Sequence, residues 1–243
     1  LLPMRLPERS VVLATASARG KLATFLAQMA AESPGSFSLS EALDGIAQAG
    51  LIVAGDLQRG AAVAFAKADS ILMGAARDEH GLDRDQIAAI NLYTQEDLGS
   101  GLSVYRPLNT ALRSEDLAQI RPFWRYTQLL QQAVLTLPPA DDDVYRGLSD
   151  PQPDIALQDI HADIAGARPL VWWAFSSTST SEAVSRSFLR GRKNVLYAVS
   201  GAGRQARNVK RYSHIPTEDE LLMPCGTAFA SQAVEVSWTC YHY

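Results

Sequence analysis

The chain has 243 residues, 47% of them hydrophobic and 20% charged, with a formal net charge of −4. This composition belongs to a globular protein with an ample core, and the weak negative charge excludes a general attraction to nucleic acid or anionic membranes. No apolar run approaches the ~20 residues of a membrane span, and residues 1–5 lack the basic start and apolar stretch of a secretory signal. We expect a monomer that binds neither nucleic acid nor membrane.

Cysteine and histidine are too sparse to suggest a metal site. The chain has two cysteines, Cys225 and Cys240, without CxxC spacing, and four scattered histidines. Two cysteines make no disulfide framework, although a single Cys225–Cys240 bridge stays open as the less favoured alternative. We therefore expect no metal.

Residues 1–82 are expected to form an accessory helical segment. Residues 18–31 are alanine-rich with larger apolar residues at helical spacing, and a Ser-Pro-Gly-Ser turn follows them. Ser40 is the candidate N-cap of a second helix, because Leu43 and Ile46 follow it at helical spacing. No chemical motif occurs in this part.

Residues 83–243 are expected to form the main domain, which opens with helices. The spacing of apolar residues predicts helices over residues 85–98 and 122–135, with a short helix beginning at residues 109–113 between them.

The period of the apolar residues then changes to that of strands. Short β-type runs are predicted over residues 144–147, 170–176, 195–200, 219–223, 228–230 and 234–238. One helix, over residues 181–189, interrupts them. A helical lobe followed by a strand-rich half favours an α+β fold over alternating βαβ units.

Arg146 and Gly147 end the first of these strand runs, in the sequence Val-Tyr-Arg-Gly. A guanidinium binds phosphate in a bidentate way, and a glycine lets a ligand approach the backbone closely. The similar Val-Tyr-Arg-Pro around Arg106 is the weaker candidate, because Pro107 has no N–H to donate and lies in the helical lobe.

Glu218 and Glu220 stand two residues apart at the start of a predicted strand. Alternate residues of a strand point to the same face, so both carboxylates would enter one cleft while Asp219 points away. Upstream, Ser177 and Thr178 belong to a Ser-Thr-Ser run that follows an aromatic stretch. Taken alone, such a run is usually a turn or a helix cap, and two nearby glutamates usually belong to a solvated loop.

Arg146, the Ser177 run and the Glu-X-Glu pair, in this order, resemble the mono-ADP-ribosyltransferases of the Arg–Ser–Glu type. The resemblance covers roughly residues 83–243 and includes the helix around residues 87–90 and the Tyr-Arg-Pro-Leu-Asn segment at residues 105–109. It implies a helical lobe packed against a split β-sandwich, with NAD as the co-substrate in the cleft between the sheets.

The resemblance also implies a role for each residue that binds NAD. Arg146 would bind the phosphates, and the main chain of Gly147 the nicotinamide amide. Ser177, followed by Thr178, would bind the nicotinamide ribose and support the catalytic glutamate. Phe188 would stack on nicotinamide, although a plain core role is nearly as well founded for a lone phenylalanine on an amphipathic helix.

Glu220 is implied as the catalytic glutamate beside the ribose 2′-hydroxyl and the oxocarbenium ion, and Glu218 as the glutamate on the acceptor side. A protonated arginine is a poor nucleophile, so a carboxylate that orients it and takes its proton favours arginine as the acceptor. A hydroxyl acceptor, such as threonine of a host protein like ubiquitin, and an NAD glycohydrolase are the alternatives. A non-catalytic binding module is disfavoured because the motif is intact.

Residues 201–206 have the sequence Gly-Ala-Gly-Arg-Gln-Ala, a formal GxGxxA after a strand. No convincing apolar-faced helix follows, so a Rossmann unit is disfavoured. The basic cluster from Arg204 to Arg211 is interpreted as a solvated loop, with contact to an acidic partner protein as the alternative. The absence of paired cysteines favours a bacterial effector or toxin that is secreted and acts in the cytosol of a target cell.

Overall fold

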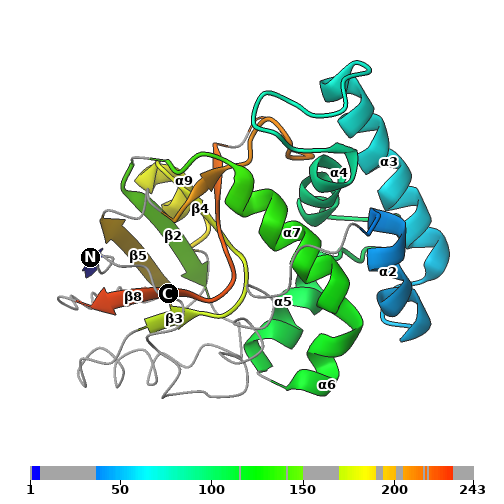
Figure 1. The fold of residues 1–243 in the computed structure, drawn as a ribbon. Coiled ribbons are helices and arrows are strands. Elements are labelled where there is room, and N and C mark those ends of the chain that lie inside the picture. Colours follow the sequence, from blue (N-terminus) through cyan, green and yellow to red (C-terminus); the bar gives the residue numbers. More distant parts are fainter. Residues whose placement is uncertain are drawn as a thin grey trace.

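The computed structural model of the chain describes residues 2–5, 37–114, 116–140, 142–149, 170–189, 194–200, 205–215, 217 and 219–231. Helices occupy one side of the molecule and strands the other (Figure 1). The helical side consists of α2 (Leu39–Gln48), α3 (Ala54–Leu72), α4 (Arg84–Tyr93), α5 (Tyr105–Ser114), α6 (Leu117–Ile120), the 3-10 helix η2 (Arg121–Phe123) and α7 (Trp124–Thr136). The short helix α9 (Glu182–Ser187) lies among the strands.

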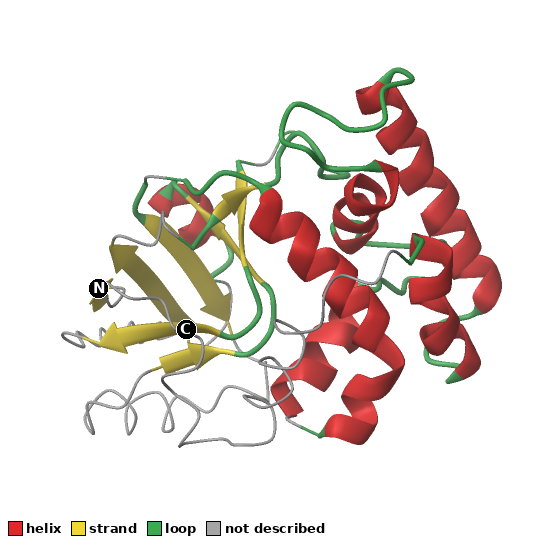
Figure 2. Ribbon diagram, viewed as in Figure 1, coloured by secondary structure: helices red, strands yellow, loops and turns green. Residues whose placement is uncertain are grey.

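Within the described residues, eight strands form one hydrogen-bonded sheet in the order β3-β8-β1-β5-β2-β4-β7-β6. Their bounds are Leu2–Arg5 (β1), Val144–Ser149 (β2), Leu170–Trp172 (β3), Ser176–Ser179 (β4), Asn194–Ser200 (β5), Arg207–Asn208 (β6), Glu220–Met223 (β7) and Thr227–Ser231 (β8). Strands β1 and β5 are parallel, and the other neighbours are antiparallel. Figure 2 shows the strands gathered beside the helical lobe, and this arrangement confirms the predicted α+β class.

Helices α2 and α4 each begin after a residue whose side chain accepts a hydrogen bond from a free backbone N–H of the first turn. At α2, Ser38 accepts from the backbone of Glu41 and its own N–H is bound by the Glu41 carboxylate, so the predicted N-cap, Ser40, is two residues too late. Asp83 caps α4 in the same way. Helix α5 begins at Tyr105, earlier than predicted, because Pro107 lies in the first turn, where no intrahelical N–H partner is lost.

The predicted strand over residues 170–176 is two strands in different parts of the sheet. Strand β3 pairs with β8, whereas β4 pairs with β7 and β2. Between them Trp173, Ala174 and Phe175 are all buried, and three consecutive buried side chains do not fit the alternation of a strand. The predicted elements over residues 18–31 and 234–238 lie outside the described residues.

Strand β7 separates two apolar cores. Leu222 points into the large core of the helical lobe, and Leu221 and Met223 point to the opposite side, where they pack with Tyr197 and Phe229. By the same alternation, Glu220 shares the face of Leu222 and is directed toward the helical lobe.

Helices α2 and α3 contribute to the same core as α4 and α7. Leu39, Ile46 and Leu57 belong to one continuous cluster with Ile90 and Leu130. Residues 37–82 are thus packed against the rest of the chain, while the division into an accessory segment and a catalytic domain at residue 83 stays a prediction.

The turn after β7 contains a buried free thiol, Cys225. Burial raises the pKa of this thiol to about 12, so it stays protonated at neutral pH. Gly226 follows with a φ of 78°, a conformation that glycine adopts without strain.

Candidate active site

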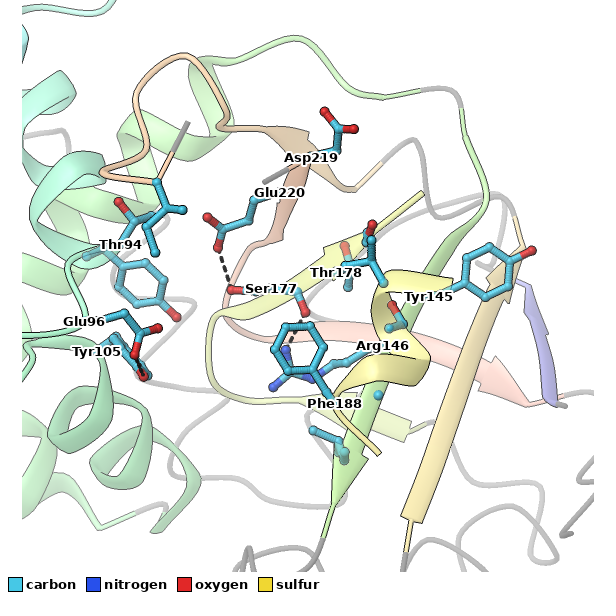
Figure 3. A pocket seen from close by; sticks show the side chains of 17 residues that line it. Thr94, Glu96, Tyr105, Tyr145, Arg146, Ser177, Thr178, Phe188, Asp219 and Glu220 are labelled. Atoms are coloured by element: carbon cyan, nitrogen blue, oxygen red, sulfur yellow. Dashed lines mark hydrogen bonds between the residues drawn. The ribbon is translucent and has the colours of Figure 1, made fainter. Parts of the chain in front are cut away.

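A cavity of about 310 Å³ lies between the helical lobe and strands β2, β4 and β7 (Figure 3). The helical lobe contributes Tyr93, Thr94, Glu96 and Tyr105 to its wall. The strands and α9 contribute the opposite wall, which contains Arg146, Gly147, Ser177, Thr178, Phe188 and Glu220. The structure therefore brings six of the seven residues predicted for the site into one cavity.

Glu220 and Ser177 form the hydrogen bond at the centre of this wall. Antiparallel pairing of β4 and β7 sets Ser177 opposite Leu222, so Glu220 is its diagonal neighbour on the same face. The Ser177 hydroxyl donates to Glu220 Oε1 over 2.6 Å, the short distance of a hydrogen bond to a carboxylate. Glu220 is thereby held with its carboxylate inside the cavity (Figure 3).

Arg146 approaches the same serine from β2. Its Nη1 donates to the Ser177 carbonyl oxygen over 2.5 Å, and its guanidinium carbon lies 5.7 Å from the centre of the Trp172 ring. Strand β2 continues to Ser149, so Arg146 lies within the strand and not at its end as predicted. Burial lowers the pKa of Arg146, opposed in part by Tyr93, but an arginine starts so high that it stays charged at neutral pH.

Gly147 is required by the packing of α9 against β2. A Cβ at this position would lie 1.9 Å from the backbone oxygen of Ser185 in α9, closer than any real contact. The sequence prediction explained this glycine only by approach of a ligand, and the structure adds that a helix already occupies the space.

Thr178 and Phe188 both line the cavity, in different ways. The Thr178 hydroxyl donates to the Leu221 carbonyl oxygen over 2.8 Å, so it ties β4 to β7. Phe188, which caps the end of α9, has 54% of its surface exposed. The alternative that Phe188 is a plain core residue is therefore wrong.

Glu218 lies outside the described residues, and its predicted place beside Glu220 stays a prediction. Its neighbour Asp219 is exposed and accepts from Lys210 Nζ over 2.6 Å. Figure 3 shows the Asp219 carboxylate directed away from the Ser177–Glu220 bond, as the strand alternation predicts.

Arg204 lies outside the described residues, and the rest of the basic cluster, residues 205–211, is not a simple solvated loop. Arg207 is buried in β6, and burial lowers its pKa. Lys210 pairs with Asp219, and Arg211 pairs with Glu79 of the helical lobe. These two cations are therefore engaged within the chain.

Arg106, the disfavoured alternative to Arg146, lies on α5 outside the cavity lining of the described residues. Its Nε donates to the Tyr105 hydroxyl over 3.1 Å, and its Nη2 lies 3.6 Å from the Glu96 carboxylate. Arg106 thus supports two residues of the helical wall.

Sequence reasoning missed the helical wall itself. Tyr93, Glu96 and Tyr105 come from a segment that was identified only as a family-like helix and loop. Tyr93 is buried, and desolvation raises its pKa, with Glu220 also raising it and Arg146 lowering it. Tyr93 therefore interacts electrostatically with both Glu220 and Arg146 of the opposite wall.

A second arginine, Arg113, was also missed. Burial is the main cause that lowers the pKa of Arg146, and the charge of Arg113 lowers it further. Arg113 lies in the last turn of α5, four residues after Asn109, and is not among the described residues that line the cavity.

The fold has known counterparts among ADP-ribosyltransferases. The eukaryotic mono-ADP-ribosyltransferase ART2.2 is 16% identical, with a TM-score of 0.55 over 97% of this chain and 91% of that chain. An ART2.2 variant in complex with NAD gives 17% identity and 0.53 over 93% and 86%. Vis toxin, an ADP-ribosyltransferase from Vibrio splendidus, gives 20% identity and 0.51 over 74% and 80%. At these identities the likeness concerns the fold.

The sequence itself assigns the family. The model of the ART family, NAD:arginine ADP-ribosyltransferase, matches residues 66–237, well over half of the chain. A search of curated protein sequences gives no significant match. The chain belongs to the NAD:arginine ADP-ribosyltransferase family, and it is a transferase that uses NAD as co-substrate.

Two expected absences concern a metal site and a membrane-spanning helix. Among the described residues, no group of three or more His, Cys, Asp or Glu side chains is arranged to hold a metal ion. No helix in the described part of the chain has the length and apolar character needed to cross a membrane. The absence of a metal stays a prediction.

Proposed function

We propose that this enzyme transfers ADP-ribose from NAD to an arginine side chain of a protein and releases nicotinamide. One observation carries the proposal: Arg146, Ser177 and Glu220 form a continuous hydrogen-bonded series along one cavity, although they come from three strands. A cation at one end and an oriented carboxylate at the other match the pyrophosphate and the oxocarbenium ion of the reaction.

NAD binding is assigned to the end of the cavity around Arg146. Its guanidinium would bind the pyrophosphate in a bidentate way. Phe188 offers an exposed ring for stacking on nicotinamide, and the main chain of Gly147 lies in the same wall for the nicotinamide amide.

Glu220 is proposed as the catalytic residue. As nicotinamide leaves, positive charge develops on the ribose, and a fixed carboxylate beside it stabilises that charge without reorganisation. Ser177 would hold one carboxylate oxygen in place and orient the ribose, and the observed 2.6 Å bond supports this role. Thr178 would act indirectly, through the bond that fixes β4 on β7.

The acceptor is proposed to be arginine. The family description names arginine, and Glu218 two residues before Glu220 would orient the guanidinium and accept its proton. The Glu96 carboxylate lies in the helical wall of the cavity, where Arg106 Nη2 is 3.6 Å away.

Two alternatives keep the same NAD chemistry. Transfer to a hydroxyl, such as threonine of a host protein, would use Glu218 as base, and NAD glycohydrolysis would use water in place of a side chain. Incubation of the enzyme with labelled NAD and agmatine, a small guanidinium compound, distinguishes them. ADP-ribosyl-agmatine supports the arginine proposal, and free ADP-ribose alone supports glycohydrolysis. Labelled protein in a lysate, without agmatine product, would point to the hydroxyl acceptor.

We further propose that the enzyme works as a secreted effector or toxin on a protein of a target cell. The fold shared with Vis toxin supports this setting. Peptide mapping of labelled proteins after treatment of several cell lysates would identify the acceptor.

A further inference from the structure

Ser213 lies in a turn that connects β6 to the catalytic strand β7, and its hydroxyl reaches Glu220. The Ser213 Oγ donates to Glu220 Oε2 over 3.4 Å, the second oxygen of the carboxylate whose Oε1 is bound by Ser177. Ser213 is 1% exposed, and its N–H donates to the Val209 carbonyl oxygen over 2.8 Å. The two carboxylate oxygens of Glu220 are thus each approached by a serine from a different segment.

The turn that carries Ser213 is attached to helix α4 on both sides of this residue. Asn91 Nδ2 donates to the Tyr212 carbonyl oxygen over 2.9 Å, and the His214 N–H donates to Thr94 Oγ1 over 2.8 Å. Asn91 and Thr94 are buried, so these bonds are shielded from water. The position of Ser213 is therefore set by a helix about 120 residues earlier in the chain, as the two hydrogen bonds span 121 and 120 positions.

A single hydrogen bond does not fix the orientation of a glutamate carboxylate. The last torsion of this side chain is broad and roughly two-fold, so donors at both carboxylate oxygens restrict it more than a donor at one oxygen does. A donor at the second oxygen restricts that rotation, and even a long bond contributes orientation when the donor itself is rigidly held.

We propose that Ser213 is a positioning residue for Glu220 and that Asn91 of α4 and Thr94, the residue that caps the end of α4, hold Ser213 in place. The proposal rests on the catalytic role proposed for Glu220. The competing explanation is that Ser213 only closes its own turn, since its Oγ also accepts from the Ile215 N–H over 3.1 Å.

The test measures NAD hydrolysis, agmatine transfer, the NAD dissociation constant and the melting temperature in Ser213→Ala. We expect kcat to fall about three- to tenfold for both reactions, because one hydrogen bond to the carboxylate is lost. The affinity for NAD should stay unchanged. Ser213→Thr, which keeps the hydroxyl, should recover most of the rate. Ser103→Ala is the matched control, since Ser103 is also 1% exposed but its hydroxyl has no hydrogen-bond partner among the described residues.

Thr94→Val gives a second, independent variant, because it removes the acceptor for His214 while keeping the side-chain shape. If Thr94 acts through Ser213, the double variant should be no slower than Ser213→Ala alone, whereas independent effects would add. Additive effects, normal kcat in Ser213→Ala, or a loss confined to NAD affinity would each overturn the proposal. Glu220→Gln is measured alongside: if it is inactive while Ser213→Ala is normal, only the role of Ser213 fails, and if Glu220→Gln keeps full turnover, the proposed function fails first.

Discussion

Replacement of Gly147 by alanine tests whether the close packing of α9 on β2 shapes the NAD site. The new Cβ would lie 1.9 Å from the Ser185 carbonyl oxygen and 3.2 Å from Leu189 Cδ2. Carbon–oxygen contacts settle near 3.3 Å, so α9 must move away from β2 by roughly 1.4 Å. Because Phe188 follows α9 directly, the movement displaces the ring proposed to stack on nicotinamide.

The size of the effect follows from this shift. Overpacking costs about 1–3 kcal/mol, and for a protein of this length each kcal/mol lowers the melting temperature by ~2–4 °C. Displacement of a binding group by about 1 Å reduces rates by up to ~100-fold. We therefore expect Gly147→Ala to lower the melting temperature by ~2–12 °C and to weaken NAD binding together with turnover.

Thermal unfolding and calorimetric titration with NAD measure both quantities. Gly55→Ala is the control, since a Cβ there meets only Arg59 Nη1 at 3.7 Å within α3, and alanine favours a helix. A Gly147→Ala protein with the wild-type melting temperature would refute the packing argument. If that protein kept the wild-type melting temperature but bound NAD weakly, the role of Gly147 would be only to let NAD approach the backbone closely.

Three further predictions concern single side chains. Ser177→Ala should lower the rate of NAD hydrolysis, measured by single-turnover kinetics, by about 10- to 100-fold, because one hydrogen bond to a charged group is lost; an unchanged rate would contradict the role of the 2.6 Å bond. Phe188→Ala should weaken NAD binding without lowering the melting temperature, because the ring is 54% exposed, and a marked loss of stability would mean that it is structural after all. Glu218→Gln should reduce transfer to agmatine far more than NAD hydrolysis, since water needs less help with deprotonation than a guanidinium; equal losses would move Glu218 to the NAD site.

The sequence was sufficient for the parts of the site that depend on local pattern. Period-two alternation predicted that Asp219 points away from the face of Glu220, and the change of period near residue 144 predicted where β2 begins. Strand β1 was not predicted: residues 2–5 lie in a segment expected to be helical, and they form a strand by pairing with the distant strands β5 and β8. The family resemblance carried by the Arg, Ser and Glu motifs implied that Arg146, Ser177 and Glu220 share one cleft, and all three residues line the same cavity in the structure.

Features that depend on contacts between distant segments could not be predicted. The Ser177–Glu220 bond requires the register of β4 against β7, which is set by packing of Leu222 and Leu221 into two different cores. The helical wall with Tyr105 likewise depends on how α4 and α5 pack, and no local pattern marks it. The clash at Gly147 exists only once α9 is in place.

The central claim is that this enzyme transfers ADP-ribose to a guanidinium by means of Glu220. The most direct test is incubation of the wild-type enzyme and of Glu220→Gln with labelled NAD and agmatine, with both ADP-ribosyl-agmatine and free ADP-ribose quantified. We expect the wild type to form ADP-ribosyl-agmatine, and Glu220→Gln, still folded and still binding NAD, to lose both products because the charge beside the oxocarbenium ion is gone. Full turnover by folded Glu220→Gln would contradict the account of catalysis, and a wild type that makes only free ADP-ribose would contradict transfer to arginine.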